Sequence, residues 1–234
     1  MTLAIMQPYI FPYIGYFQLV QAADKFVFYD DVNFIRQGWI NRNNLLLNGA
    51  PHLFTVPLEK QSPNNLINEV AISAALYERW KDKFYKTLEQ AYRKAPHYAT
   101  VLELIKAVME SSVTHIGELA KKSIELTSRY MGLDTEFVQS STLYENAELK
   151  SATRVLDICA KEGATVYINP IGGQELYNKE LFREHGIDLY FLKAGATPYT
   201  QLKNEFVPYL SIIDVLMFNA ASDLSEVLIN YKLI

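Results

Sequence analysis

Hydrophobic and polar positions along the 234-residue chain fall into short apolar runs that alternate with longer amphipathic segments. Residues 3–6 form a continuous apolar run, residues 14–23 follow a helical pattern, and residues 25–29 form a second run. Continuous runs of this length are typical of strands that are buried on both faces of a sheet. The chain therefore opens with a predicted strand–helix–strand unit.

Three amphipathic helices are predicted in the middle of the chain, over residues 76–92, 101–109 and 116–131. In the first of them, apolar residues recur at every fourth position, namely Leu76, Trp80, Phe84, Leu88 and Tyr92. Ahead of these helices, residues 53–58 and 69–72 are typical of strands placed around a Ser-Pro-Asn-Asn turn at 62–65. We expect them to form an antiparallel excursion from the main sheet.

Glycine marks three predicted helix ends in the last part of the chain, at Gly132, Gly163 and Gly186. Each is followed by an apolar run typical of a strand, at 135–138, 165–169 and 188–192. Parallel strands need crossover connections, so this repetition predicts an α/β fold with a mostly parallel sheet and helices on both faces, a three-layer arrangement. The mid-chain helices form an insertion, and residues 1–234 form one predicted domain.

The net charge and the cysteine and histidine content argue against some classes of function. The net charge of −4 comes from 22 basic and 26 acidic residues, which gives no positive field for a nucleic acid backbone. The single cysteine, Cys159, excludes an internal disulfide and is expected to be buried and inert. The four histidines show no pair at metal-ligand spacing. A nucleic acid partner and a histidine-based metal site are therefore not expected.

The first charged residue is Asp24, so residues 1–23 must be tested as a signal peptide or membrane span. No basic residue precedes the apolar stretch, and prolines and glutamines interrupt it. We therefore expect a cytoplasmic protein without a membrane span.

Three segments that follow predicted strands carry candidate chemistry, because ligands of open α/β sheets bind outside the carboxyl ends of the strands. The first is 7–16, where a helix N-terminus offers N–H groups to an anion. Its candidate substrate-binding residues are Gln7, Tyr13, Gly15 and Tyr16. The alternative is that these aromatic residues are simply core.

Residues 30–44 are polar and are expected to form a long loop at the carboxyl end of the second strand. The second segment, 30–43, lies in this loop and combines two adjacent carboxylates with arginines, an indole and amides. Arginine can grip phosphate bidentately, and aspartate can hold Mg²⁺ or accept a proton. The candidate catalytic residues are Asp30, Asp31 and Arg42, and the candidate binding residues are Arg36, Trp39 and Asn41. The alternative is a solvated loop.

The third segment, 167–177, is a glycine-containing connection that could place backbone N–H groups on a phosphate, or form a plain turn. Its candidate binding residues are Asn169, Gly172, Gly173 and Tyr177. Asp214 lies in an apolar stretch, 211–218, where a buried carboxylate must be paired. We expect a capping or network role for it, with a site acid as the alternative.

These segments together resemble the WbqC-like family. The resemblance rests on the run from Met6 to Phe17 (MQPYIFPYIGYF), on Asp30-Asp31-Val32, and on Gly38-Trp39-Ile40-Asn41-Arg42-Asn43. It extends to Tyr167-Ile168-Asn169-Pro170-Ile171-Gly172-Gly173, to Tyr199 and Gln201, and to the run from Leu210 to Leu216. Tyr199 and Gln201 thereby join the candidate binding residues, and the resemblance implies that the three segments converge on one site.

The resemblance implies a role in bacterial O-antigen or related surface-polysaccharide biosynthesis. It implies a transferase or ATP-dependent amide ligase that joins a glycine-like amino acyl group to an amino sugar, as a sugar nucleotide. ATP and Mg²⁺ would be the cofactors. The alternatives are a non-catalytic sugar-nucleotide-binding scaffold, and a metal-dependent glycosyltransferase that uses Asp30 and Asp31. The acyl donor, the sugar and any homo-oligomer stay open.

Residues 11–16 are also similar in position to the His-x-Gly-His turn of nucleotidylyltransferases, with Tyr13 and Tyr16 in place of the histidines. This likeness implies a Rossmann-like, nucleotidylyltransferase-like topology. Because tyrosine is neutral at pH 7, it argues more for the fold than for ATP chemistry.

Overall fold

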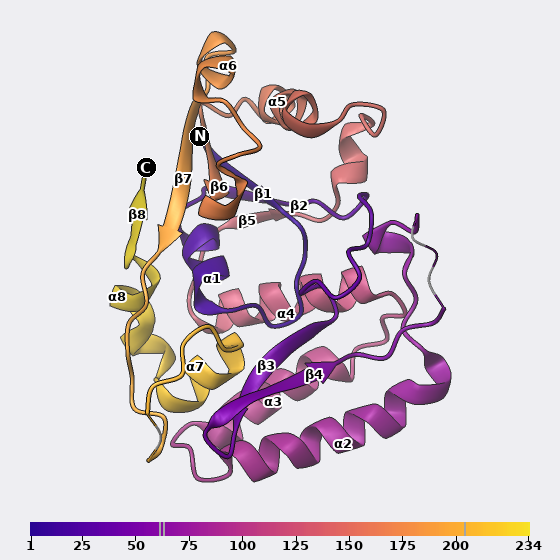
Figure 1. Ribbon diagram of the computed structural model, residues 1–234, viewed down its shortest axis with the longest axis vertical. Coiled ribbons are helices and arrows are strands. Elements are labelled where there is room, and N and C mark those ends of the chain that lie inside the picture. The colour runs from indigo at the N-terminus through magenta and orange to yellow at the C-terminus, as the bar shows by residue number, and fades with distance from the viewer. Residues whose placement is uncertain (61, 63, 204) are drawn as a thin grey trace.

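Six strands form one mostly parallel sheet in the computed structural model, in the order β5-β2-β1-β6-β7-β8 (Figure 1). All neighbours are parallel except β7 and β8, which are antiparallel. The strands are β1 (Thr2–Met6), β2 (Lys25–Phe28), β5 (Glu136–Val138), β6 (Val166–Pro170), β7 (Asp188–Ala194) and β8 (Tyr231–Leu233). The structure describes residues 1–60, 62, 64–203 and 205–234, so Pro63 of the predicted 62–65 turn lies outside it.

Strand β1 lies inside the sheet, where Leu3 is in register with Lys25 of β2 and with Tyr167 of β6. Its side chains alternate between the two faces. Ala4 faces one buried core and Leu3 and Ile5 face the other. Both faces of the sheet are therefore covered, which explains why the strand reads as a continuous apolar run.

Helices pack on both faces. The larger core contains side chains of α1 (Ile14–Gln21), α4 (Ile116–Tyr130), α7 (Ile212–Phe218) and α8 (Ser225–Leu228). The smaller core contains side chains of α5 (Ser151–Glu162) and α6 (Lys179–Glu184). Cys159 is fully buried in the smaller core. The predicted α/β class, with a mostly parallel sheet, is confirmed.

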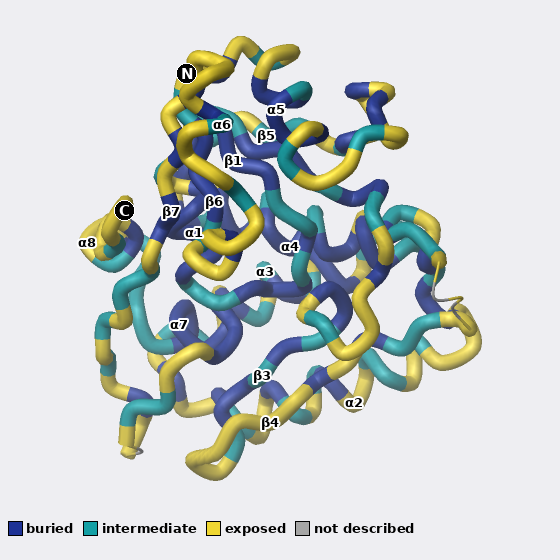
Figure 2. Tube along the Cα trace, turned by 45° about the horizontal axis from the view of Figure 1, so that its top comes forward, coloured by how far each residue is buried: buried dark blue, intermediate teal, exposed yellow. Residues whose placement is uncertain are grey.

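The mid-chain insertion adds further elements to the larger core, besides α4. The insertion contains α2 (Ala74–Tyr92), α3 (Tyr98–Met109) and a hairpin of β3 (Arg42–Leu47) and β4 (Ala50–Thr55), and several residues of β3 are buried (Figures 1 and 2). The Trp80 ring stacks on Phe84 at 5.1 Å between centroids, and Phe84 meets Phe54 at 4.9 Å. Aromatic packing thus joins α2 to the hairpin.

Two predictions in this region are wrong. Residues 30–44 were expected to be loop throughout, yet β3 begins at Arg42; and β4 pairs with β3, not with 69–72. Residues 67–69 form a 3₁₀ helix, and only an isolated bridge joins Leu58 to Ile72. The hairpin turns at Asn48-Gly49, both at positive φ (53° and 77°). Asn-Gly is a strong hairpin signal, which the sequence interpretation overlooked.

The predicted glycine helix ends are confirmed, since Gly132, Gly163 and Gly186 all have φ between 65° and 74°. Glycine takes this left-handed conformation without a Cβ penalty. Strand β8 was not predicted. It pairs with β7 over three residues, so its sequence signal is short.

Candidate functional site

The loop after β1 is folded around Phe11, a buried residue at positive φ (40°). Its N–H donates to Ser123 Oγ at 3.0 Å, and its carbonyl accepts from Asn43 Nδ2 at 2.8 Å and Ser211 Oγ at 2.7 Å. The neighbouring Ile10 N–H donates to the Ile40 carbonyl at 3.1 Å. These bonds join segments 7–16 and 30–43, which were expected to share a site.

A pocket of about 210 Å³ opens at this junction, lined by Tyr9, Pro12, Tyr13, Trp39, Asn43 and Tyr209. We call it the aromatic pocket. Trp39 is 45% exposed and Tyr209 is 74% exposed. Burial raises the pKa of Tyr9 to about 12 and raises that of Tyr13. The hydroxyls of these two tyrosines are therefore protonated at neutral pH, and no charged side chain among the described residues lines the pocket.

Gly15 makes room for one wall of the aromatic pocket. A Cβ at Gly15 would lie 2.3 Å from the Tyr13 ring, which folds over the start of α1. The residue after Gly15 is the buried Tyr16, whose hydroxyl donates to the Gln7 carbonyl at 2.9 Å. Glycine at position 15 and the Tyr16 bond thus shape the loop, while Tyr13 itself faces the pocket.

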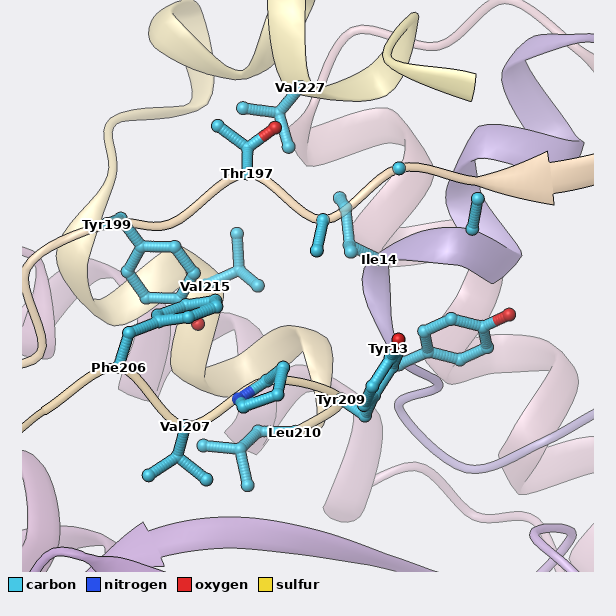
Figure 3. A pocket seen from close by; sticks show the side chains of 14 residues that line it. Tyr13, Ile14, Thr197, Tyr199, Phe206, Val207, Tyr209, Leu210, Val215 and Val227 are labelled. Atoms are coloured by element: carbon cyan, nitrogen blue, oxygen red, sulfur yellow. The ribbon is translucent and has the colours of Figure 1, made fainter. Parts of the chain in front are cut away.

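Tyr209 and Tyr13 line both the aromatic pocket and a second, smaller cavity of about 40 Å³. The Tyr209 ring meets Tyr13 edge-on at 6.4 Å, and the Tyr209 backbone is at positive φ (59°). Figure 3 shows the smaller cavity between Tyr13 and Ile14 of the α1 start, Thr197 after β7, and Tyr199, Phe206 and Val207 of the next loop. Non-glycine residues with a positive φ, such as Tyr209, concentrate at ligand sites.

Beneath the smaller cavity, the fully buried Asp214 carboxylate accepts three hydrogen bonds. The donors are Tyr199 Oη at 2.6 Å, Gln201 Nε2 at 2.7 Å and Tyr92 Oη at 2.9 Å. Burial raises the pKa of Asp214, and these three bonds offset part of that rise. Tyr199 and Gln201 thus lie together as a network around Asp214, and Tyr199 also lines the cavity.

Asp30 and Asp31 lie after β2, beside the end of β5, and each faces a cation. Lys121 Nζ is 2.8 Å from Asp30, and Arg154 pairs with Asp31 within hydrogen-bond distance. Ser140 donates to Asp30 at 2.7 Å, and Ser141 donates to Asp31. The two carboxylates are thereby neutralised within the protein.

This arrangement does not fit a Mg²⁺ site at Asp30 and Asp31, because the side chains of Lys121 and Arg154 already pair with these carboxylates. Among the described residues, no group of three His, Cys, Asp or Glu side chains is arranged to hold a metal ion.

Arg36 belongs to the loop that carries Trp39, and Arg42 begins β3 directly after that loop. Arg42 donates to the carbonyls of Gly38 (3.0 Å) and Gln37, and its guanidinium carbon lies 5.9 Å from the Trp39 ring centroid. The Arg36 side chain is exposed. The nearby Asn41 donates to the Val56 carbonyl at 2.9 Å, which ties the loop to the end of the hairpin.

The third predicted segment also reaches the carboxyl edge of the sheet, after β6, but its aromatic side chains pack into the smaller core. Asn169 Nδ2 donates to the Tyr167 hydroxyl at 2.7 Å, and Tyr177 meets Tyr167 edge-on at 6.0 Å. A Cβ at Gly173 would collide with Asn169 Oδ1, whereas Gly172 faces open space. No described residue of this segment lines the aromatic pocket.

The structure thus brings Tyr13 and Trp39 together, with Arg42 beside them, and places the other predicted site residues around or away from this pocket. Sequence reasoning did not single out Tyr9, Asn43, Tyr209, Lys121 and Arg154. Tyr9 and Asn43 lie inside the motifs that were noted, so they could have been found. Tyr209, Lys121 and Arg154 come from remote segments that carry no local signal.

The sequence pattern of the WbqC-like protein family matches residues 7–226, which include the three candidate segments 7–16, 30–43 and 167–177. The chain belongs to the WbqC-like family. It is also similar to the uncharacterized protein Rv1507c of Mycobacterium tuberculosis, with 28% identity over 228 residues that cover 96% of each chain. No solved structure matches the chain. No helix in the described part of the chain is both long and apolar enough to cross a membrane.

Proposed function

We propose that this WbqC-like protein is a cytoplasmic enzyme of bacterial O-antigen or related glycan biosynthesis. It transfers a glycine-like amino acyl group to the amine of an amino sugar, carried as a sugar nucleotide, and forms an amide. The observation that carries the proposal is the aromatic pocket, with its uncharged walls and its place beside the start of α1.

The pocket suits one ring of a larger ligand. Complete small-molecule sites measure roughly 300–1,000 Å³, so about 210 Å³ holds one part of a substrate. Aromatic faces pack against the C–H faces of a sugar ring, and protonated tyrosine hydroxyls can hydrogen-bond its oxygens. The absence of charge among the described walls favours the sugar over the phosphates for this position.

The phosphates of the sugar nucleotide would lie at the rim, near Arg42 and Arg36. Arg42 donates to two carbonyls, and a guanidinium has five N–H donors, so donors remain for a phosphate oxygen. Arg36 lies in the loop that carries Trp39, and Arg42 is the first residue of the strand that follows this loop. This places a positive rim beside an uncharged pocket, which matches the chemistry of a sugar nucleotide.

In the proposed reaction, the sugar amine attacks the carbonyl carbon of an activated acyl donor, an adenylate or a thioester. The C–N bond forms, the bond to the phosphate or thiolate leaving group breaks, and the amine proton passes to water. Lys121 and Arg154 neutralise Asp30 and Asp31, so these carboxylates do not take the proton directly. They act as positioning residues that hold the segment after β2 in place. A direct role as proton acceptor would require one of these cations to move away.

A Rossmann-like, nucleotidylyltransferase-like chain path is part of the proposal. It is supported by the strand order, in which the sequence runs outward from β1 to β2 and β5 on one side and from β6 to β7 and β8 on the other. In such sheets, ligands bind outside the strand ends where the order reverses. The aromatic pocket is formed by the loop that follows β1.

The test is turnover. Purified protein is incubated with glycine, ATP and a panel of UDP-linked amino sugars, and with acyl-CoA donors in parallel, and the products are identified by mass spectrometry. An acylated amino-sugar nucleotide, lost in Trp39→Ala and Tyr13→Ala but kept in the exposed-site control Leu176→Ala, supports the proposal. Sugar-nucleotide binding without product would indicate a scaffold, and release of a nucleoside diphosphate would indicate glycosyl transfer.

A further inference from the structure

The largest of the cavities described here, about 480 Å³, lies away from the aromatic pocket and shares no lining residue with it. It is open to solvent and is lined by the β3–β4 turn, the C-terminal end of α2, the 202–203 loop and Phe218 of α7. Its volume falls within the range of roughly 300–1,000 Å³ that is typical of small-molecule sites. We call it the cationic pocket.

Three basic side chains from two separate segments, Arg93, Lys94 and Lys203, surround this pocket. Within residues 1–60, 62, 64–203 and 205–234, no acidic side chain lines it and no ion pair engages these three cations. Six other lysines and arginines do form ion pairs, namely Lys25, Lys81, Lys106, Lys121, Arg154 and Lys161. In a chain of net charge −4, the pocket is thus a local reversal of sign.

Apolar side chains form part of the lining of the cationic pocket, and we call this part its floor. It consists of Leu46, Ala91, Leu202 and Phe218, and the buried Tyr92 ring packs edge-on against Phe218 at 6.0 Å. Apolar side chains that share a pocket with several cations match a ligand that combines a flat ring with phosphate groups. An inorganic anion would use only the cations and leave the floor uncovered.

We propose that the cationic pocket binds a nucleotide-sized phosphorylated ligand, with its phosphates between Arg93, Lys94 and Lys203 and its ring on the floor. The proposal does not depend on the function assigned to the aromatic pocket. Two hydrogen bonds link the cationic pocket to the smaller cavity beside Tyr209. Tyr92, which lines the cationic pocket, donates to Asp214, and Asp214 accepts from Tyr199, which lines the smaller cavity.

The test uses ADP, pyrophosphate and adenosine as probes in calorimetric titrations of the full chain at constant ionic strength. ADP should bind more tightly than either fragment. Arg93→Ala/Lys94→Ala should weaken ADP by about tenfold or more, since two charge-assisted contacts are lost. The matched control is Arg79→Ala/Lys83→Ala, which removes the same charge from exposed positions of α2 and should change the affinity by less than about twofold.

Three results would overturn the proposal: no ADP binding by the wild-type protein, equal losses in both double variants, or loss of ADP binding in Trp39→Ala. The last result would assign ADP to the aromatic pocket, so the two proposals can fail separately. Thermal melting of each variant, compared with the wild type, verifies that the fold is retained.

Discussion

The Tyr92 hydroxyl, at the end of α2, donates to the buried Asp214 carboxylate of α7 across 2.9 Å, although the two residues are 122 positions apart. The same hydroxyl accepts from the Leu46 N–H of β3 at 2.8 Å. A single carboxylate therefore joins the mid-chain insertion to the C-terminal helices. The first prediction concerns its ionisation.

Asp214→Asn should change how stability depends on pH. Burial raises the pKa of Asp214 in the folded protein, so the native carboxyl holds its proton to a higher pH than the unfolded one. Wild-type stability therefore falls as pH rises from the ordinary carboxyl value of 3.8 through the raised folded value, and this loss stops above it. The variant lacks this loss. Urea unfolding of both proteins at a series of pH values should show the stability of the wild type falling relative to that of the variant as pH rises through that window; a difference that does not change with pH would contradict the assignment.

Arg154→Ala should destabilise the protein strongly. Asp31 and Arg154 have side chains that are only 6% and 4% exposed, so the substitution leaves a buried carboxylate without its cation. Losing one partner of such a pair costs about 3–5 kcal/mol in the free energy of unfolding. Denaturant titration measures this cost. The double variant Asp31→Asn/Arg154→Met removes both charges and should recover part of the loss; no recovery would show that the pair is not the cause.

Tyr209 combines a strained backbone with an exposed ring, and two substitutions separate these properties. Tyr209→Gly removes the penalty of positive φ, whereas Tyr209→Ala keeps it, so the glycine variant should be more stable by about 1 kcal/mol. Both variants lose one wall of the aromatic pocket and should bind its ligand equally weakly. Thermal unfolding and ligand titration check the two parts. Equal stability of the two variants would show that Tyr209 carries no such strain.

Gln18 ties α1 to the C-terminal region. Its Nε2 donates to the carbonyls of Val227 (2.8 Å), Asn230 (3.0 Å) and Gly195 (3.3 Å). Gln18→Leu would remove these three bonds, although the Asn230 and Val227 carbonyls keep backbone donors, so the expected cost is about 0.5–1.5 kcal/mol for each bond lost. Hydrogen exchange should rise over 195–230, while the exposed control Gln21→Leu on the same helix should leave it unchanged. Unchanged exchange in the Gln18 variant would contradict this tie.

The parallel strands could be predicted because each is a local apolar run, and the helix ends because glycine at positive φ is a local signal. The sequence interpretation paired residues 53–58 with 69–72 and missed β3, because the Asn48-Gly49 turn was overlooked. Strand β8 has only three residues, and its partner β7 is distant in sequence. Pairing of short strands depends on tertiary context more than on local pattern.

The candidate site was predictable in its motifs and not in its geometry. All three segments were expected to converge on one site: segments 7–16 and 30–43 meet through Phe11 and Asn43, whereas no described residue of 167–177 lines the aromatic pocket. The sequence could not indicate that Arg154, 123 positions away, neutralises Asp31, because any of 22 cations could do so. Nor could it place Tyr209 over Tyr13. The catalytic and binding roles given to these residues stay predictions.

The stacking of Trp80 on Phe84 has a practical consequence for spectroscopy. The chain has two tryptophans, and the other one, Trp39, forms a wall of the aromatic pocket. A Trp80→Phe variant would keep an aromatic ring in the α2 stack and leave Trp39 as the sole indole fluorophore. The intrinsic emission of that variant then reports on the polarity and occupancy of a single pocket wall, without any attached dye.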